Sequence, residues 1–413
     1  MTDSGFVLLC RTRPLSPYLL KNHFEKEGRE LCKIEILNRG WIHMAIKIFH
    51  TADLHIGMKF SNYPEPAKGM LRQARVDVLR GMVDVANRER CNLFVIAGDL
   101  FHNTTGIRKS DINSVVSILE SFQGECVAVL PGNHDFDNEM VQLWKSFKAL
   151  ELEKIVFVAE ERPYPLDEFD LNAVVYPAPC HFKHSGKNNI GWIKSAAMDD
   201  GKVNIAIAHG SIEGVSPDFE GEYFPMEQGE LEALPVEVCL LGHTHVKYPV
   251  GRGKTGGKVF NPGTPEPDGL DCRHEGNAWI ISVDDEKKVS ADPVETGIFR
   301  FVDKTVEIRE SEDYENIERD LLGGKSEKTI ARLKLAGRVD EDVLKERLSV
   351  YERLEEALVC LMTDDSDLGA KITRETISGE FSEGSFPQKF LSLLADDEEA
   401  LRMAYELVLE VKK

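Results

Sequence analysis

The sequence predicts an α/β fold, namely a four-layer α/β/β/α sandwich followed by a C-terminal α+β region. Three observations lead to this prediction. Short apolar runs alternate with amphipathic, helix-like stretches in the first part of the chain, which predicts βαβ connections. Beyond Glu153 the pattern changes to short strands and proline-rich turns, which predicts a mixed sheet layered against the first one. Residues 300–413 differ again, because 18 Lys and Arg stand against 28 Asp and Glu, a net charge of −10.

The apolar runs are short and rich in β-branched residues, which indicates strands that are buried on both faces. They are Ile46 to Phe49, Leu93 to Ala97, Val127 to Leu130, Val203 to Ala208 and Val236 to Leu241. Helical spacing of apolar residues predicts helices over Arg72 to Arg90 and Asp111 to Phe122. In the last region we expect a strand over Thr329 to Leu335, and helices over Glu341 to Met362 and about Asp397 to Val411.

Polar islands stand where these five strands end. They are Asp53-Leu54-His55, Gly98-Asp99, Gly132-Asn133-His134-Asp135, Ala208-His209-Gly210 and Gly242-His243-Thr244-His245. The ends of such strands converge at the rim of a sheet, where open α/β folds place their ligands. Gly-Asp and Gly-His pairs are also common in ordinary turns, but five such islands in order favour a shared site.

Imidazoles and carboxylates without thiolates indicate an open catalytic metal site rather than a closed structural zinc site. Manganese, iron and zinc all suit these ligands. Two divalent ions beside Asp53 and Asp99 would leave a formal charge of about +2, which attracts an anionic phosphate. The islands therefore predict a two-metal phosphoesterase site.

The order D-x-H, GD, GNHD, H and GHxH resembles the calcineurin-like metallophosphoesterase superfamily, from Ala45 to about Val294. Within it, His50 to Gly57 and Gly98 to His102 resemble the DNA-repair exonuclease branch, the SbcD-type nucleases and their YhaO-like relatives. The turn Asn261 to Pro265 is similar to one in that branch. The resemblance implies a metallophosphoesterase sandwich over residues 44–298. The apolar stripes of residues 299–413 either pack on each other and on the catalytic domain, or belong to a capping and helical partner-binding region.

The resemblance also implies roles for individual residues. Asp53, His55 and His245 would bind one ion, Asn133, His209 and His243 the other, and Asp99 would bridge the two. Mn²⁺ is the ion we expect, with Fe²⁺ or Zn²⁺ as alternatives. His134 would face the scissile phosphate, and His102 would help to seat a nucleic-acid backbone.

A mechanism follows as a hypothesis: hydroxide attacks phosphorus, and His134 stabilises the phosphate or protonates the leaving oxygen. Asp135 could orient His134, although adjacent side chains usually diverge. We expect a DNA exonuclease and endonuclease acting in DNA repair. The alternatives are a small-molecule phosphodiesterase or phosphatase, and a scaffold that holds DNA ends for an SMC-like ATPase with hydrolysis secondary.

The expected partners are DNA and an SMC-like ATPase subunit, with a homodimer left open. A net charge of −21 is unusual for a protein that binds DNA, so capture would depend on metals, local basic clusters or a partner. Two clusters are candidates, although the first more readily indicates a solvated helix face: Arg72, Arg75 and Arg80, and Lys247, Arg252, Lys254 and Lys258.

The cysteine pattern and the chain termini set further bounds. Eight scattered cysteines without a C-x-x-C pair indicate reduced core residues of a cytoplasmic protein. No apolar stretch approaches the roughly 20 residues that a membrane span needs. Residues 1–43 precede the first strand, and Met44 stands where a family member would begin, so we expect a non-native start or a loosely ordered extension.

Overall fold

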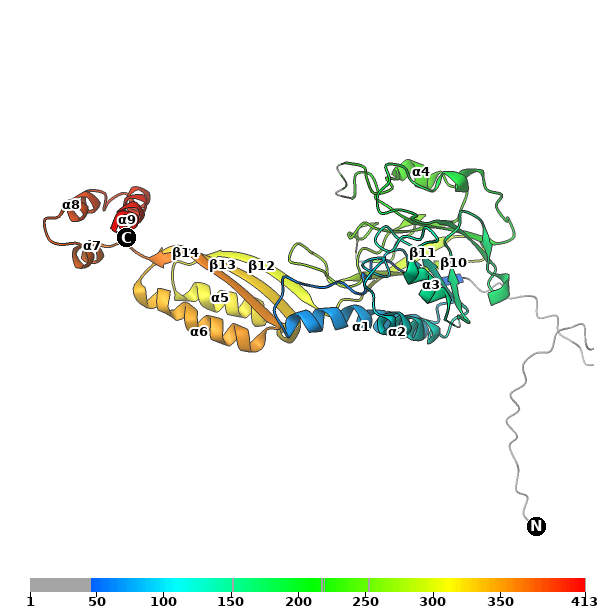
Figure 1. Ribbon diagram of the computed structural model, residues 1–413, viewed down its shortest axis with the longest axis horizontal. Helices are drawn as coiled ribbons and strands as arrows, with labels where there is room; N and C mark the ends of the chain where they lie inside the picture. The colour runs from blue at the N-terminus through cyan, green and yellow to red at the C-terminus, as the bar shows by residue number, and fades with distance from the viewer. Residues whose placement is uncertain (1–45, 151, 217, 219, 252, 413) are drawn as a thin grey trace, which may run out of the picture. The chain divides into compact units, whose positions relative to one another are not determined.

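The computed structural model describes residues 46–412 apart from 151, 217, 219 and 252 (Figure 1). The prediction for residues 1–43 and the basic residue Arg252 lie outside the described residues. The described elements belong to one compact unit, Met44–Lys413.

The first sheet has six strands in the order β11-β10-β1-β2-β3-β4. Strands β1 to β4 are parallel, and β10 and β11 add to the β1 edge in antiparallel fashion. The strands are β1 (Ile46–Thr51), β2 (Leu93–Ala97), β3 (Cys126–Leu130), β4 (Ile155–Phe157), β10 (Asn277–Val283) and β11 (Val289–Glu295). Helices α1 (Ala67–Arg88), α2 (Lys109–Glu120) and α3 (Gln142–Lys148) pack on its outer face through an aliphatic and aromatic cluster.

The second sheet has the order β5-β6-β7-β8-β9, with β6 to β9 parallel. Its strands are β5 (Tyr164–Pro165), β6 (Ala173–Ala178), β7 (Val203–His209), β8 (Val238–Gly242) and β9 (Val259–Phe260). Its inner face shares a core with the first sheet, in which Val95, Ile207 and Trp279 are buried. The 3-10 turns Asp167–Phe169 and Gly191–Ser195 and the short helix α4 (Gln228–Glu232) belong to the same half, and a further cluster that includes Ile193 and Leu231 lines the outer face of the sheet. The result is the predicted four-layer α/β/β/α sandwich, with α1 to α3 and α4 on opposite sides (Figure 1).

The C-terminal region alternates strands and helices. Its sheet has the order β12-β13-β14 with all strands parallel, and α5 and α6 lie on one face of it (Figure 1). The elements are β12 (Arg300–Glu307), α5 (Ser311–Leu322), the 3-10 turn Ser326–Lys328, β13 (Thr329–Val339), α6 (Glu341–Ala357), β14 (Cys360–Ala370), α7 (Arg374–Glu380), α8 (Phe386–Leu393) and α9 (Glu398–Lys412). Near its start, Phe299 and Phe301 pack with Leu71 of α1.

Several element boundaries differ from the prediction, two of them by five residues. Helix α1 begins at Ala67 rather than at the predicted Arg72. The helix expected to run to Met362 ends at Ala357, because the apolar residues that follow enter β14 and pair with β13. Strand β14 was not predicted because it contains Asp364, Asp365 and Asp367, and aspartate is a poor strand former.

Two predictions from composition concern the state of the cysteines and the presence of membrane-spanning helices. The six cysteines in the described part are free, and all but Cys272 are buried. Across residues 46–412, where described, no helix is both long enough and apolar enough to span a membrane.

Candidate metal centre

Each polar island lies where a strand of one of the two central sheets ends. Strands β1, β2 and β3 of the first sheet lead into Asp53, Asp99 and Asn133, while β7 and β8 of the second lead into His209 and His243. The two sheets share one core, so these strand ends meet at one edge of the sandwich. All seven predicted metal ligands are brought together there by the contacts described below.

The backbone at these islands is locally strained. The φ angles of Asp53, His55, Asp99 and His243 are 55°, 50°, 53° and 92°. Left-handed backbone costs a non-glycine residue about 1–2 kcal/mol, and it persists only where the surroundings hold it. Here the Asp53 and His55 N–H groups donate to the carbonyls of Gly98 and Asp99 at 3.1 and 3.0 Å. The first two islands therefore hold each other in shape.

Glycines precede the ligands because a side chain would fill the site. A Cβ atom on Gly98, whose φ is +94°, would lie 2.1 Å from His209 Nδ1. A Cβ atom on Gly132 would lie 2.2 Å from Asp99 Oδ1. The Gly-Asp and Gly-Asn-His-Asp patterns thus reflect close approach between islands.

Asp53, His55 and His245 form one side of the centre, which we call side A. Their ligand atoms all lie within 4.8 Å of one another. His55 Nε2 is 3.3 Å from His245 Nε2, and His245 Nε2 is 4.0 Å from Asp53 Oδ1. These are the three residues expected to share one ion.

Asn133, His209 and His243 form the other side, which we call side B. Asn133 Oδ1 lies 3.0 Å from His209 Nε2 and 3.0 Å from His243 Nδ1. The Nδ2 atom of Asn133 is buried and has no hydrogen-bond partner among the described residues. The amide oxygen, rather than the nitrogen, therefore faces the ligand atoms.

Asp99 lies between the two sides. Its Oδ2 atom is 3.7 Å from His55 Nε2 and 3.5 Å from His209 Nε2. Burial would raise the pKa of Asp99, but the neighbouring histidines, His209 first, outweigh burial and hold that pKa below its usual range. An ionised carboxylate in this position suits the bridging role.

Hydrogen bonds fix which nitrogen of His209 and of His245 faces the centre. His209 Nδ1 donates to the carbonyl of Ala97 at 2.8 Å, which leaves Nε2 for the centre. His245 Nδ1 donates to Asp268 Oδ2 at 3.2 Å, with the same result. Such partners orient metal ligands and set their tautomer. Asp268 was missed in the sequence because it lies in an irregular segment, where only its proximity to the Asn261 to Pro265 turn signals it.

The electrostatics of the site fit bound cations. Burial raises the pKa of Asp53 to about 6, and it lowers the pKa of His243 to about 3. Burial would also lower the pKa of His209, but Asp99 and Asp53 raise it to about 9. The carboxylates of Asp99 and Asp53 thus favour a positive charge at this position, which a bound cation can also supply. The oxygen and nitrogen donors fit two divalent ions of the manganese, iron or zinc type.

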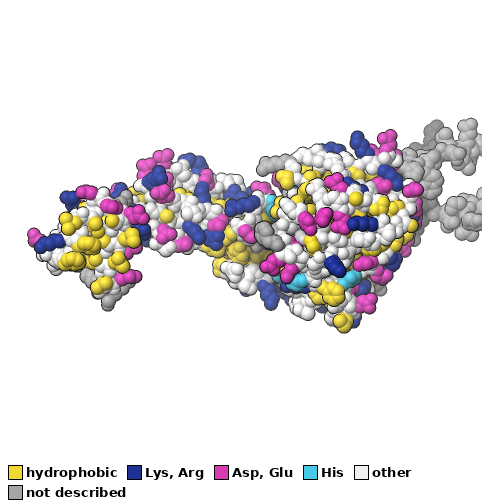
Figure 2. All heavy atoms as spheres, turned by 90° about the horizontal axis from the view of Figure 1, so that it is seen from above, with side chains coloured by type: hydrophobic (Ala, Val, Ile, Leu, Met, Phe, Trp, Pro, Cys, Tyr) yellow, Lys and Arg dark blue, Asp and Glu magenta, His cyan; other side chains and the backbone are white. Residues whose placement is uncertain are grey.

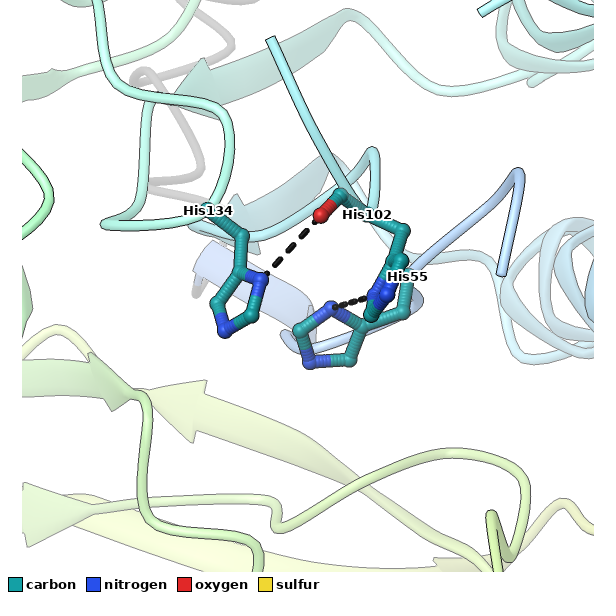
Figure 3. A group of neighbouring side chains, drawn as sticks. All are labelled: His55, His102 and His134. Atoms are coloured by element: carbon teal, nitrogen blue, oxygen red, sulfur yellow. Dashed lines mark hydrogen bonds between the residues drawn. The ribbon is translucent and has the colours of Figure 1, made fainter. Parts of the chain in front are cut away.

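His134 and His102 lie beside side A (Figure 3). His134 Nδ1 donates to the carbonyl of His102 at 3.1 Å, and its backbone N–H donates to Asp99 Oδ1 at 2.8 Å. His102 Nδ1 is 3.4 Å from His55 Nδ1. The rings of His134 and His55 are 4.9 Å apart, centroid to centroid. Both predicted histidines therefore belong to the same cluster as the ligands.

Asp135 does not take the part expected of it. Its carboxylate accepts the N–H groups of Gly132 at 2.7 Å and Phe101 at 2.9 Å, and it is fully buried. Burial raises its pKa to about 8. The described contacts orient His134 through the carbonyl of His102 instead. Asp135 ties two islands together because adjacent side chains point in different directions.

One residue of the basic clusters is corrected. Arg75 is 1% exposed rather than part of a solvated face, whereas Arg72 and Arg80 are exposed as expected. Lys254 pairs with Asp292 at 3.7 Å, and Lys258 donates to the backbone carbonyls of Glu232 and Leu234. These lysines are committed to partners in the protein.

Comparison with known proteins gives a family match and two curated relatives. Residues 46–247 match the family model described as calcineurin-like phosphoesterase. The DNA double-strand break repair protein Mre11 of Saccharolobus solfataricus is 24% identical over 207 residues, 49% of this chain and 50% of that protein. The uncharacterized metallophosphoesterase YhaO of Bacillus subtilis is 25% identical over 210 residues, 48% of each chain. The chain thus spans about half the length of the curated relatives it matches.

Among solved structures, a dimetal phosphatase from Danio rerio is similar to 61% of this chain and 99% of its own. The TM-score is 0.31 and the sequence identity is 12%.

Proposed function

Because residues 46–247 form a calcineurin-like phosphoesterase domain, we propose that the protein is a two-metal phosphodiesterase that cuts DNA, as an exonuclease and endonuclease in DNA repair. The observation that carries the proposal is the joining of His102 and His134 to the ligands of side A. The 24% identity to a protein named for double-strand break repair supports the choice of substrate.

The ligand residues would hold two divalent ions, which we propose to be Mn²⁺. When bound, such ions lower the pKa of an attacking water and neutralise the phosphate. Asp53, His55 and His245 would hold one ion and Asn133, His209 and His243 the other, with Asp99 between them. These residues are buried or partly buried, so the phosphate meets a site whose geometry is already set.

His134 is the group we assign to the phosphate. Its Nδ1 proton is held by the carbonyl of His102, which leaves Nε2 available to substrate. In the imidazolium form, Nε2–H donates to a phosphate oxygen or to the leaving oxygen. His102, half-buried beside it, would contact the nucleic-acid backbone.

DNA capture in this proposal depends on more than surface charge. The net charge of −21 opposes non-specific binding of nucleic acid. Lys254 and Lys258 are engaged within the protein. We therefore propose that the metal centre and a partner protein supply most of the affinity.

Helices α7, α8 and α9 present the surface we assign to that partner, an SMC-like ATPase. The exposed fractions of Phe386, Leu393 and Leu407 are 76%, 83% and 60%, and apolar side chains gather over these helices (Figure 2). Phe386 and Leu407 border a hollow of about 810 Å³. Exposed apolar patches of this kind commonly mark protein interfaces. A second copy of the chain is the other candidate occupant.

Co-purification tests the partner surface. The double variant L393E/L407E should lose the ATPase and keep its nuclease activity. A variant that still co-purifies with the ATPase contradicts the assignment, and loss of a dimer in light scattering would identify a second copy instead.

The free, buried cysteines further support a reducing, cytoplasmic location.

One assay tests the activity. Purified protein is offered end-labelled single-stranded and double-stranded DNA, and separately bis-p-nitrophenyl phosphate, with Mn²⁺, Mg²⁺ or chelator. We expect product ladders from DNA with Mn²⁺ and none with chelator. Rapid hydrolysis of the small diester with intact DNA would select the small-molecule alternative. A metal-free variant that still complements a deletion would select the scaffold.

A further inference from the structure

Arg75 is a buried cation in helix α1, next to the metal centre. Its exposed fraction is 1%, and its Nε atom has no hydrogen-bond partner among the described residues. A buried arginine is costly unless its charge and donors are used. Its donors therefore indicate what it does.

The guanidinium joins α1 to two loops. Nη1 lies 3.4 Å from the carbonyl of Leu54 and 3.0 Å from that of Glu266. Nη2 lies 3.4 Å from the carbonyl of Pro267. The planar group, with donors fixed in a fork, reaches both loops at once, which a lysine ammonium matches poorly.

The first loop carries two ligands of side A. Leu54 stands between Asp53 and His55, whose left-handed backbones take them out of the regular ladder of β1. The N–H groups of these two residues are bonded to the second island, and the Leu54 carbonyl is bonded to Arg75. A buried carbonyl without a partner destabilises the fold, so Arg75 stabilises this strained turn.

The second loop supports His245, the third expected ligand of side A. Asp268 follows Pro267 directly, and its carboxylate accepts a hydrogen bond from His245 Nδ1 at 3.2 Å. Glu266, two residues before Asp268, anchors this loop. Its carboxylate accepts hydrogen bonds from the N–H groups of Ile298 at 2.6 Å and Phe299 at 2.9 Å. Arg75 thus supports the loop that orients His245.

We propose that Arg75, together with Asp268, is a positioning residue for side A and determines whether the ion on that side is bound. The inference rests on the proposed two-metal centre, but it is independent of the substrate. On side B, His209 is held directly by the carbonyl of Ala97 and not by these two loops. Loss of Arg75 should therefore weaken the binding of one ion and spare the other.

Manganese binding tests this inference on the full chain. We compare wild type with R75M, and use R72M as the matched control because Arg72 is exposed one turn earlier on α1. Calorimetric titration of wild type and R72M should give two tight Mn²⁺ sites. R75M should keep one and bind the other roughly 10–100-fold more weakly. In electron paramagnetic resonance, the coupled two-ion spectrum should become that of an isolated Mn²⁺.

D268N provides a second variant that keeps the size of the side chain, and circular dichroism checks folding. It should show the same selective loss, since an amide accepts the His245 hydrogen bond more weakly than a carboxylate. If R75M fails to fold, D268N decides the question. Two unchanged Mn²⁺ sites in a folded R75M, or in D268N, would overturn the inference while leaving the proposed function intact. A wild type that binds no Mn²⁺ would overturn both.

Discussion

Sides A and B of the metal centre use similar atoms but are supported differently. Side B includes His209, the last residue of β7, whose ring is fixed by the carbonyl of Ala97 in β2 of the other sheet. Side A places Asp53 and His55 on a left-handed turn and relies on Asp268 to orient His245. Side B also has a neutral amide where side A has a carboxylate. His209 is therefore supported at a strand end, while His245 of side A depends on a buried polar group from a distant part of the chain.

The largest effect should come from D99A, which removes the group common to both sides. Without its carboxylate, 3.7 Å from His55 Nε2 and 3.5 Å from His209 Nε2, neither ion retains its bridge. We expect loss of both ions and no measurable turnover. Elemental analysis of the purified variant, beside hydrolysis of a diester, measures both. Two ions retained in D99A would mean that the sides are independent.

Single-ligand variants should separate the sides. H55A should weaken Mn²⁺ binding on side A and N133A on side B, so each should keep one tight site. The loss of affinity should be smaller in N133A, because it removes a neutral oxygen and leaves both imidazoles of side B. Calorimetric titration measures the number of tight sites and the affinity of the weakened one. If either variant lost both ions, the division into two sides would fail.

H134A should spare both ions and lower turnover. The His134 ring bonds to the carbonyl of His102 and is not one of the seven expected ligands. We expect kcat to fall roughly 10²–10⁴-fold with unchanged metal content, as for loss of a positioned acid. DNA cleavage at the wild-type rate would remove His134 from the mechanism.

The smallest effect concerns stability and probes the strand-borne support. His50 Nε2 donates to the carbonyl of Leu241 at 3.1 Å, just before His243, and burial lowers the pKa of His50 from its usual 6.5 to about 3. The unfolded chain then binds a proton that the folded chain does not. The free energy of unfolding should fall as the pH drops from 6.5 toward 3, by at most about 1.4 kcal/mol per pH unit. Above pH 6.5 this contribution is constant.

Urea unfolding across this pH range measures the effect, with H50N as the comparison because asparagine does not titrate. The difference in slope between wild type and H50N isolates His50 from other titrating groups. Equal slopes would show that His50 is not buried in its neutral form.

The strands, the sandwich and the seven convergent ligands were predictable because their signals are local. Each apolar run and the polar island after it lie within a few residues of each other. Arg75 and Asp268 were not, since their roles depend on loops far away in the sequence. Arg75 stands one turn from Leu71 and from Leu79 on the buried face of α1, but the sequence does not indicate which carbonyls its guanidinium reaches. Asp135 was misplaced for a related reason, because a neighbour in sequence is not a neighbour of the side chain.

Glu266 gives the metal centre a mechanical link to the C-terminal region. Its carboxylate accepts hydrogen bonds from the N–H groups of Ile298 and Phe299, immediately before β12. Two residues after Glu266, Asp268 accepts a hydrogen bond from His245. A displacement of the chain where the C-terminal region begins therefore has a short, hydrogen-bonded route to a histidine of side A. Tension on the C-terminal region and the orientation of His245 therefore both depend on the short segment from Glu266 to Asp268.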